Sequence, residues 1–423
     1  KTLLTAGNDT NQFTATSFSS LATVAVADST LDVSDLNDSI AQANTATGGT
    51  STSFTISSGG TINGGTAAEF TALLGYESGS QISISNQNLT VDSGTMTVAN
   101  AAAFSATTSG TVTGEITSGT TISAMLDSSS GLKDTGTTAT QALTITVASG
   151  DAEATAANLT SLYGKTTVAV DASAVTQITG SVAEANIVYA AGASEITGLG
   201  NETVVTTDSS LSDVTTLNTL DGNTTGTVNT ASVNSITGTL AKLLTAYGSN
   251  GITGLGNETI SVSDTGGGSS LAASDLNSLD SKTSGTITTA NGLVTLTGTV
   301  AALNTAYGSA GLSIQGDEAI TISDTTVDAE ALNNLNNYTS GVINADTLTK
   351  LTGTLADVNV AFAADAASSA TISGLGDQDV ELTDTNVLAA DLNTLNGYTG
   401  GTVDASTVAV MEGTVSALNT AYD

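Results

Sequence analysis

An internal repeat of 56 to 60 residues is the feature that most limits how this chain can fold. The string Ile-Thr-Gly-Leu-Gly-Asn-Glu occupies residues 196–202 and recurs identically at 252–258, and related strings end at Glu318 and Gln378. Its second glycine is at Gly200, Gly256, Gly316 and Gly376, so the copies are spaced by 56, 60 and 60 residues. A unit repeated in this way cannot bury its apolar face alone and must stack on its neighbours.

Two further landmarks fix the repeat boundaries. A Leu-Asn-x-Leu string starts at Leu217, Leu276, Leu332 and Leu392, with a relative at Leu159. A Gly-Thr or Gly-Ser pair occurs in each copy, and an aromatic residue follows its glycine by nine positions: Tyr189, Tyr247, Tyr307, Phe362 and Tyr422. We therefore define five repeats, at 141–190, 191–248, 249–308, 309–363 and 364–423, and expect residues 1–140 to be diverged coils of the same architecture.

Each repeat contains two half-repeats, and each half-repeat pairs strand and helix patterns. In the last copy, Val380 and Leu382 alternate with polar residues, which predicts a strand ending near Asp384. The spacing of Leu388, Leu392 and Leu395 then predicts one face of a helix. A second strand is expected at 402–404, followed by a helix with Val415, Leu418 and Tyr422 on one face and Thr414 as its N-cap.

Half-repeats of this size predict a repetitive, β-rich fold, a parallel β-solenoid with short helices in its coils and 56–60 residues per double coil. Stacked coils place Thr, Ser and Asn in register, and the absence of proline leaves every backbone amide available for pairing. The alternative is a string of small β-sandwich domains of about 60 residues, which the helical spacing in each copy disfavours.

The composition excludes several classes of function. With 40 acidic and 6 basic residues the net charge is −34, so neither nucleic acid nor an anionic membrane surface is an expected partner. No apolar run is long enough to predict a membrane-spanning helix. Cys and His are both absent, which removes thiolate and imidazole chemistry, and we expect no enzymatic activity.

Recurring acids are the candidate metal ligands. Asp208, Asp264, Asp324 and Asp384 each follow a predicted strand, and oxygen-rich turns stacked in register would suit Ca²⁺. The alternative is that each Asp caps its own turn or the following helix through backbone amides. We favour capping, because the chain has neither a calcium-binding nonapeptide nor an EF-hand spacing.

Other candidate sites are weaker. A carboxylate pair for glycoside hydrolysis, such as Glu153 with Asp171, belongs to the repeat pattern rather than interrupting it. Tyrosines after the Leu-x-x-Leu helices could stack on sugars but more often pack: Tyr163, Tyr338 and Tyr398. Threonine-rich strings could form an ice-binding face, but their sequences differ from copy to copy: 144–146, 287–289 and 321–323.

The last repeat suggests self-association. It runs to Tyr422 and Asp423 without a polar capping helix, and an uncapped solenoid exposes strand edges and apolar core. Head-to-tail stacking would cover this surface and propagate into a filament, with Val415, Leu418 and Tyr422 near the junction. Because the chain begins at Lys1, we expect either a removed signal peptide or a fragment, and both accord with export.

The segments at 351–362 and 403–422 resemble repeats of large secreted cell-surface proteins of marine bacteria, cyanobacteria in particular. The resemblance covers residues 142–423 and lies in the general sequence pattern of the repeats. It implies an extracellular or cell-surface location and a structural or adhesive role. We therefore expect a structural repeat protein that assembles into a filament, fibre or surface layer. The alternative is an adhesin or phage-type fibre module that binds surface polysaccharide.

Overall fold

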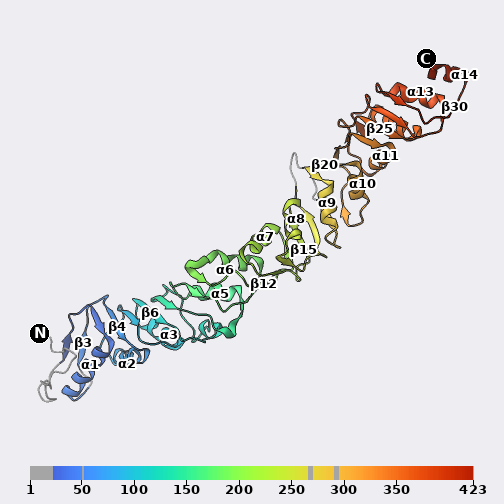
Figure 1. Cartoon of the computed structure of the whole chain (residues 1–423). Helices are drawn as coiled ribbons and strands as arrows, with labels where there is room; N and C mark the ends of the chain where they lie inside the picture. Colours follow the sequence, from blue (N-terminus) through green and yellow to red (C-terminus); the bar gives the residue numbers. More distant parts are fainter. Residues whose placement is uncertain (1–21, 50–51, 265–269, 290–294, 423) are drawn as a thin grey trace. The chain divides into compact units, whose positions relative to one another are not determined.

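The computed structural model describes residues 22–49, 52–264, 270–289 and 295–422. The first 21 residues of the segment predicted to form diverged coils lie outside this description. The chain divides into an N-terminal unit, Lys1–Thr207 with Leu220–Asn229, and a C-terminal unit, Asp208–Thr219 with Thr230–Asp423. In both units short strands alternate with helices along the sequence (Figure 1).

The N-terminal unit contains two main parallel sheets. Strands β2, β4, β5, β6 and β7 lie side by side in that order, and β8, β10, β12 and β14 form a second row. The strands are β1 (Thr23–Ala25), β2 (Thr30–Asp32), β3 (Ser53–Thr55), β4 (Thr61–Gly65), β5 (Asn88–Val91), β6 (Thr111–Glu115), β7 (Thr140–Thr144), β8 (Glu153–Thr155), β9 (Val170–Asp171), β10 (Gln177–Gly180), β11 (Ile196–Thr197), β12 (Thr203–Thr206) and β14 (Val228–Asn229). The helices are α1 (Val33–Thr47), α2 (Ala67–Ser78), α3 (Val98–Thr107), α4 (Ile122–Met125), a 3₁₀ turn η2 (Ser149–Asp151), α5 (Ala156–Tyr163) and α6 (Val182–Glu195).

The C-terminal unit has the same alternation. Its strands are β13 (Ser210–Leu211), β15 (Ser235–Gly238), β16 (Ile252–Thr253), β17 (Thr259–Val262), β18 (Ser270–Ala272), β19 (Ile287–Thr289), β20 (Thr295–Gly298), β21 (Leu312–Ser313), β22 (Ala319–Ile322), β23 (Thr326–Asp328), β24 (Ile343–Asn344), β25 (Lys350–Gly353), β26 (Ile372–Ser373), β27 (Asp379–Leu382), β28 (Asn386–Leu388), β29 (Val403–Asp404) and β30 (Val410–Glu412). Its helices are α8 (Leu240–Gly248), α9 (Ala273–Asp280), α10 (Val300–Gly308), α11 (Ala329–Tyr338), α12 (Leu355–Ala366), α13 (Ala389–Tyr398) and α14 (Val415–Tyr422). The chain changes unit after Thr207, Thr219 and Asn229, and the second of these points falls within α7 (Val214–Asn223).

Parallel pairing places equivalent apolar residues in register. In the sheet ordered β18-β20-β22-β24-β26, a row of facing residues is buried throughout: Leu271, Leu296, Ile320, Ile343 and Ile372. The strand pairs whose register is defined in the described residues are all parallel. A string of antiparallel β-sandwiches would not pair its strands in this way, so the structure is a repetitive arrangement of parallel strand and helix units.

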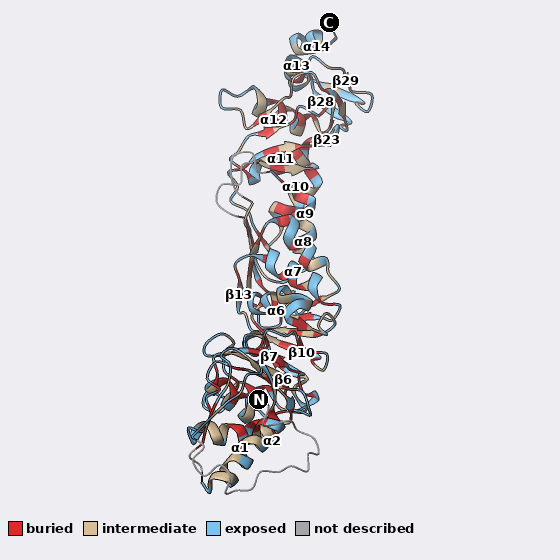
Figure 2. Ribbon diagram, turned by 90° about the vertical axis from the view of Figure 1, so that its left-hand side faces the viewer, coloured by how far each residue is buried: buried red, intermediate tan, exposed pale blue. Residues whose placement is uncertain are grey.

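Helices of consecutive half-repeats pack against one another beside the sheets. In the C-terminal unit each helix from α8 to α14 contacts the next. Helices α9, α10 and α11 each have buried positions on one side and exposed positions on the other (Figure 2). The buried positions of α10 are Val300, Leu303 and Ala306, spaced by three residues as on one face of a helix. The core of this unit therefore lies between a row of strands and a row of helices.

A buried threonine attaches the turn after many helices to the strand region of the preceding half-repeat. The Thr399 hydroxyl donates to the backbone carbonyl of Gln378 at 2.7 Å and accepts from the backbone N–H of Gly401 at 3.0 Å. Thr339 makes the equivalent pair of bonds with Glu318 and Gly341. Since both hydroxyl functions are used inside the protein, these threonines hold half-repeats together rather than facing solvent.

The last repeat differs in detail from its prediction. The predicted strand and second helix are present as β27 and α14, and the Thr414 hydroxyl accepts from the backbone N–H of Ala417 at 3.2 Å, as an N-cap does. Leu388, however, lies in β28 at the N-cap position of α13 and is 51 % exposed, so it is not part of the buried helix face. Two short strands, β28 and β30, were not predicted.

Candidate functional site

The recurring acids bind helix N-termini. In three copies the backbone N–H of the first residue of a helix donates to one oxygen of the carboxylate. The donor and acceptor pairs are Leu240 and Asp264 at 2.7 Å, Val300 and Asp324 at 2.8 Å, and Leu355 and Asp384 at 2.6 Å. The capped helices α8, α10 and α12 precede these acids in the sequence. The expectation that each Asp caps its own turn or the following helix was therefore wrong in direction. The negative charge still lies at the positive end of a helix dipole.

The fourth candidate acid, Asp208, lies between β12 and β13, and its backbone carbonyl accepts from the Ser232 hydroxyl at 2.9 Å. Across the described residues, no three carboxylates come together where they could hold a metal ion. Asp264, Asp324 and Asp384 each bind a different helix and are not brought together. The geometry of Asp264, Asp324 and Asp384 is that of capping groups.

Replacing Asp324 by Ala should lower the free energy of unfolding by about 1 kcal/mol, because the N–H of Val300 loses its acceptor and the helix dipole loses its anion. Urea denaturation followed by circular dichroism measures the change. Asp317→Ala, at an exposed acid, is the matched control and should have a smaller effect. A chelator at fixed ionic strength should leave the wild-type melting temperature unchanged, and a large decrease would restore the calcium hypothesis.

Three buried carboxylates belong to glutamates of the repeated turn that reads Gly-Leu-Gly-Asn-Glu in two copies and Ile-Gln-Gly-Asp-Glu in the third. Glu202 and Glu258 are 0 % exposed and Glu318 is 2 % exposed. Each carboxylate accepts from the backbone N–H of the glycine two residues earlier, at 2.8 to 2.9 Å, and from a tyrosine hydroxyl. The tyrosine bonds are Tyr189 to Glu202 at 2.9 Å, Tyr247 to Glu258 at 2.7 Å and Tyr307 to Glu318 at 3.1 Å.

These contacts change the acidity of the tyrosines. Burial, together with the neighbouring carboxylate, raises the pKa of Tyr189, Tyr247 and Tyr307 far above the ordinary tyrosine value. The neutral phenol is the form that donates to the carboxylate. The pairs are therefore hydrogen-bonded latches between the end of one helix and the turn that follows it, and the tyrosines are not poised to act as bases.

The last copy of the latch replaces both partners. Phe362 occupies the tyrosine position and Gln378 the glutamate position. The Gln378 amide oxygen accepts from the N–H of Gly376 at 2.6 Å, and its amide nitrogen donates to the backbone carbonyls of Leu348 and Gly374 at 3.1 and 2.8 Å. The paired change keeps every buried polar atom of this side chain bonded without a phenol or a charge.

An asparagine row links the helices of the C-terminal unit. The amide nitrogen of each donates to a backbone carbonyl on the next helix, at 2.9 to 3.1 Å: Asn218 to Lys242, Asn277 to Ala302, Asn304 to Ala331, Asn333 to Asp357, Asn359 to Asp391 and Asn393 to Ala417. We call these bonds the asparagine ladder. The Leu-Asn-x-Leu string of the sequence included Asn218, Asn277, Asn333 and Asn393, but it did not identify Asn304, Asn359 or any of the partners on the next helix.

Tyrosines proposed to stack on sugars have different environments. Tyr338 is 48 % exposed, and its ring stacks on Tyr307 with centroids 5.7 Å apart and planes inclined by 6°. Tyr398 stacks on Phe362 at 6.3 Å and 4°. Tyr163 is only partly exposed. Packing against another aromatic ring accounts for Tyr398, whereas Tyr338 also leaves a large part of its surface in solvent.

The two carboxylates considered for hydrolysis, Glu153 of β8 and Asp171 of β9, lie on strands of different sheets. Asp171 accepts from the backbone N–H of Ser173 at 3.0 Å, and bonds from the Ser173 N–H and hydroxyl lower the pKa of Asp171. Glu153 is exposed in β8, opposite Gln177 of β10. A threonine-rich face for ice is also incomplete, because Thr289 is buried.

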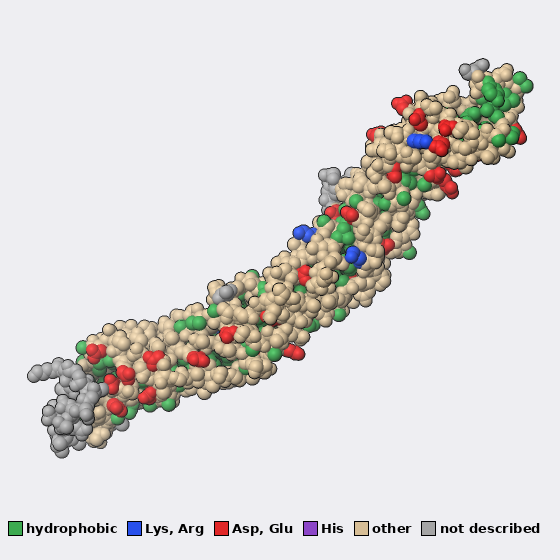
Figure 3. Space-filling model, viewed as in Figure 1, with side chains coloured by type: hydrophobic (Ala, Val, Ile, Leu, Met, Phe, Trp, Pro, Cys, Tyr) green, Lys and Arg blue, Asp and Glu red, His purple; other side chains and the backbone are tan. Residues whose placement is uncertain are grey.

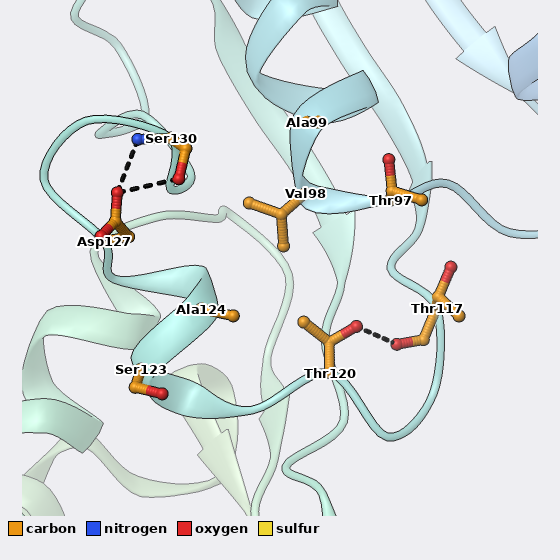
Figure 4. Close-up of a pocket in the computed structure, with 9 residues that line it drawn as sticks. All are labelled: Thr97, Val98, Ala99, Thr117, Thr120, Ser123, Ala124, Asp127 and Ser130. Carbon is orange, nitrogen blue, oxygen red and sulfur yellow. Dashed lines mark hydrogen bonds between the residues drawn. The ribbon is translucent and has the colours of Figure 1, made fainter.

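An open groove in the N-terminal unit lies beside the start of α3 and the turn after α4 (Figure 4). Its polar lining includes Thr97, Thr117, Thr120, Ser123, Asp127 and Ser130. The Asp127 carboxylate accepts from the backbone N–H of Ser130 at 2.7 Å and from the hydroxyls of Ser129 and Ser130 at 2.8 Å. Bonds from Ser130 and then Ser129 hold the pKa of Asp127 well below its usual range. This carboxylate stabilises its own turn and has no catalytic partner in the groove.

One charged cluster interrupts the repeat and was not predicted. In the sheet containing β25, β27 and β29, Lys350 lies opposite Asp379, and Glu381 lies opposite Asp404. The Lys350 ammonium forms an ion pair with Glu381, and this bond raises the pKa of the lysine. The corresponding strand in the preceding sheet begins with Thr295 opposite Ala319. Lysine is rare in this sequence, so a lysine within a predicted strand was the one sign in the sequence that could have indicated this charged cluster.

The proposed assembly residues lie on α14. Val415 is 75 % exposed, Tyr422 is 80 % exposed and Leu418 is partly exposed. The corresponding residues of α10, Val300 and Leu303, are 3 % and 0 % exposed. Figure 3 shows hydrophobic side chains gathered at this end of the C-terminal unit. These α14 residues are therefore more exposed than their equivalents in α10.

Comparison with known proteins adds no assignment, because neither the protein-family models nor the curated proteins that were searched match the chain. Among the described residues, the helices are too short or too polar for any of them to cross a membrane.

Proposed function

We propose that this chain is an extracellular structural protein, a parallel β-solenoid whose copies associate end to end into a filament, fibre or surface layer. The observation that carries the proposal is the direction of its polar contacts. Capping aspartates and the asparagine ladder bond from one half-repeat to its neighbour, and the latches join helix to turn within the stack. Polar groups used in this way stabilise a stack of half-repeats, and few polar groups are left that could catalyse a reaction.

Composition agrees with this role. Catalysis by imidazole or thiolate is excluded, and the strong negative charge favours solubility outside the cell over binding to nucleic acid. The likeness of the repeats to those of secreted bacterial surface proteins points the same way. An extracellular location remains part of the proposal and follows from composition and resemblance together.

Association would cover the exposed face of α14. Burying large apolar side chains such as Val415 and Tyr422 contributes about 1.5 to 3 kcal/mol for each one fully removed from water. A second copy of the chain offers strands and helices of the same repeat as a cover. A contact between two different ends propagates instead of closing, so it generates a filament.

Light scattering after size exclusion, with electron microscopy of the same samples, tests the proposal. The chain should form extended oligomers as its concentration rises, and Val415→Glu or Tyr422→Glu should decrease the association constant by tenfold or more. Ser416→Glu, at an exposed polar position of the same helix, is the matched control and should change it far less. A chain that stays monomeric at high concentration would contradict end-to-end assembly.

Polysaccharide binding is the second candidate, and the half-exposed ring of Tyr338 favours it. Aromatic faces held rigid by a second ring, here Tyr307, are suited to stacking on a sugar ring. Affinity electrophoresis in gels containing a neutral glucan tests this, with Tyr338→Ala expected to lose any retardation. Tyr76→Ala, in α2, is the control variant.

A further inference from the structure

We propose that the exposed ring of Tyr338 and the carboxylate of Asp317 form a binding site for an amino sugar, a pyranose that carries a protonated amino group. The site takes one unit of a polysaccharide that has free amino groups. This inference rests on polysaccharide binding, the second candidate function, and specifies the chemical class of its ligand.

The ring of Tyr338 is a rigid platform. It is 48 % exposed, and it stacks on Tyr307 with ring centroids 5.7 Å apart and planes inclined by 6°. Tyr307 is itself held in place, because its hydroxyl donates to the buried carboxylate of Glu318 at 3.1 Å. A pyranose presents a face of C–H groups, which packs well on an aromatic ring whose position is fixed in advance. The exposed surface of Tyr338 therefore suits a sugar ring.

Asp317 supplies a negative charge beside this platform. The backbone N–H of Ser340, two residues after Tyr338, donates to the carbonyl of the glycine before Asp317 at 2.8 Å, so the two segments lie side by side. Burial and the latch carboxylate raise the pKa of Tyr307, and the charge of Asp317 adds to this rise, so it acts on the stacked rings. Since Asp317 is exposed, a ligand on the ring can reach its carboxylate.

The last repeat contains a second copy of this arrangement. The ring of Tyr398 stacks on Phe362 with centroids 6.3 Å apart and planes inclined by 4°. Asp377 follows the second glycine of its turn and is exposed. One oxygen of its carboxylate lies 3.0 Å from the position that a Cβ atom on Gly400, two residues after Tyr398, would take. Tyr398 is less exposed than Tyr338, so the site around Tyr338 is the principal one.

The ring and the acid change together along the chain. The position of the exposed tyrosine is occupied by Asn223 in the first copy of the turn and by Lys282 in the second. In the same two copies the position of the acid is occupied by Asn201 and Asn257. The glycine before this position donates to the latch glutamate whether Asn or Asp follows it. The aspartate is therefore not required by the fold of the turn, and it accompanies the ring.

Charge selects the kind of sugar. A carboxylate beside an aromatic ring attracts a cation, and the face of the ring itself also attracts an ammonium group. The chain has a net charge of −34, which disfavours sulfated or carboxylated polysaccharides as ligands. A sugar with a free amino group combines the two features that this site recognises, a flat face for the ring and a positive charge for the carboxylate.

Titrations followed by NMR, with short oligomers of glucosamine and with their N-acetylated forms, test the site in the full chain at about pH 6, where amino groups are protonated and aspartates ionised. A Tyr398→Ala background removes the second copy. The amino oligomers should bind more tightly than the acetylated ones, and added salt should weaken only the amino oligomers. Tyr338→Ala should weaken both by about tenfold, because both lose the platform. Tyr338→Phe, which keeps the ring, should bind both as before.

Asp317→Asn is the decisive variant, because it installs the residue of the earlier copies and removes only the charge. It should weaken the amino oligomers about threefold to fivefold, the effect of one exposed ion pair, and leave the acetylated oligomers unaffected. Glu330→Gln removes the same charge at an exposed position at the other end of α11, about 12 Å from Tyr338 along the helix axis. This control should change neither affinity.

Three results would overturn the site. If both kinds of oligomer bind equally and Asp317→Asn changes neither, the amino-sugar assignment fails while polysaccharide binding stands. If Asp317→Asn and Glu330→Gln weaken the amino oligomers equally, the attraction comes from the whole acidic chain and not from this site. If neither kind of oligomer binds, the second candidate function fails together with this inference, and end-to-end assembly is decided by its own test.

Discussion

Replacing Tyr247 by Phe, or Glu258 by Gln, should each lower the free energy of unfolding by about 1.5 to 3 kcal/mol, the range for hydrogen bonds that involve a charged group. The phenylalanine variant leaves a fully buried carboxylate with one donor fewer. The glutamine variant removes the charge and introduces an amide whose N–H groups need acceptors. Urea denaturation measured by circular dichroism gives both values.

The double variant Tyr247→Phe with Glu258→Gln should cost clearly less than the sum of the two single changes, because it reproduces the Phe362 and Gln378 pair that the chain already contains. In that copy the glutamine amide finds two backbone carbonyls in place of the phenol. Additive losses would show that tyrosine and glutamate act independently, which would contradict the latch. Tyr338→Phe, which changes a tyrosine outside the latches, is the control.

Raising the pH above about 10 should destabilise the protein steeply. Burial and the carboxylates raise the pKa of Tyr189, Tyr247 and Tyr307 in the folded chain, while the unfolded chain ionises its tyrosines near the ordinary value. The stabilisation is therefore complete below the ordinary tyrosine value and is lost progressively as the pH rises above it toward the raised pKa of the folded chain, since over that interval only the unfolded state releases these protons.

Urea midpoints measured between about pH 9 and 11.5, together with the ultraviolet absorbance of tyrosinate, check the alkaline effect. The variant with all three latch tyrosines changed to Phe should lose less stability over the same interval, although it starts from a lower value. Its pH dependence would match that of wild type only if other groups caused the alkaline loss. Three of the eight tyrosines of wild type should ionise only on unfolding.

Local pattern was sufficient for much of the architecture. The spacing of Leu332 and Leu335 identified the buried face of α11, and the repeat period identified which strands are equivalent. Alternation of apolar and polar residues placed β27, and Thr414 was recognised as a cap. These features depend on residues within a few positions of one another, so the sequence carries them directly.

Partners across half-repeats were decided by the tertiary structure. The repeat pattern singled out Asp324, but its acceptor role for a helix that begins 24 residues earlier depends on how neighbouring half-repeats stack. The amide of Asn333 likewise reaches Asp357 only because α11 and α12 pack together. Spacing along the chain does not show which end of a neighbouring element lies opposite, so the direction of capping could not be read from it.

For the tyrosine latch, the sequence showed the two partner positions but not the contact between them. Sequence comparison of the copies showed aromatic residues and the Glu or Gln position as separate landmarks, and their joint change to Phe362 and Gln378 was visible. What the sequence by itself determined was the repeat, most of its strands and helices, and most of the residues that face inward, with β28, β30 and the exposed Leu388 as the exceptions in the last copy. Only the tertiary structure joined Tyr307 to Glu318, because a hydrogen bond requires two groups to meet within about 3 Å, and that meeting is set by the packing of the helix against the following turn.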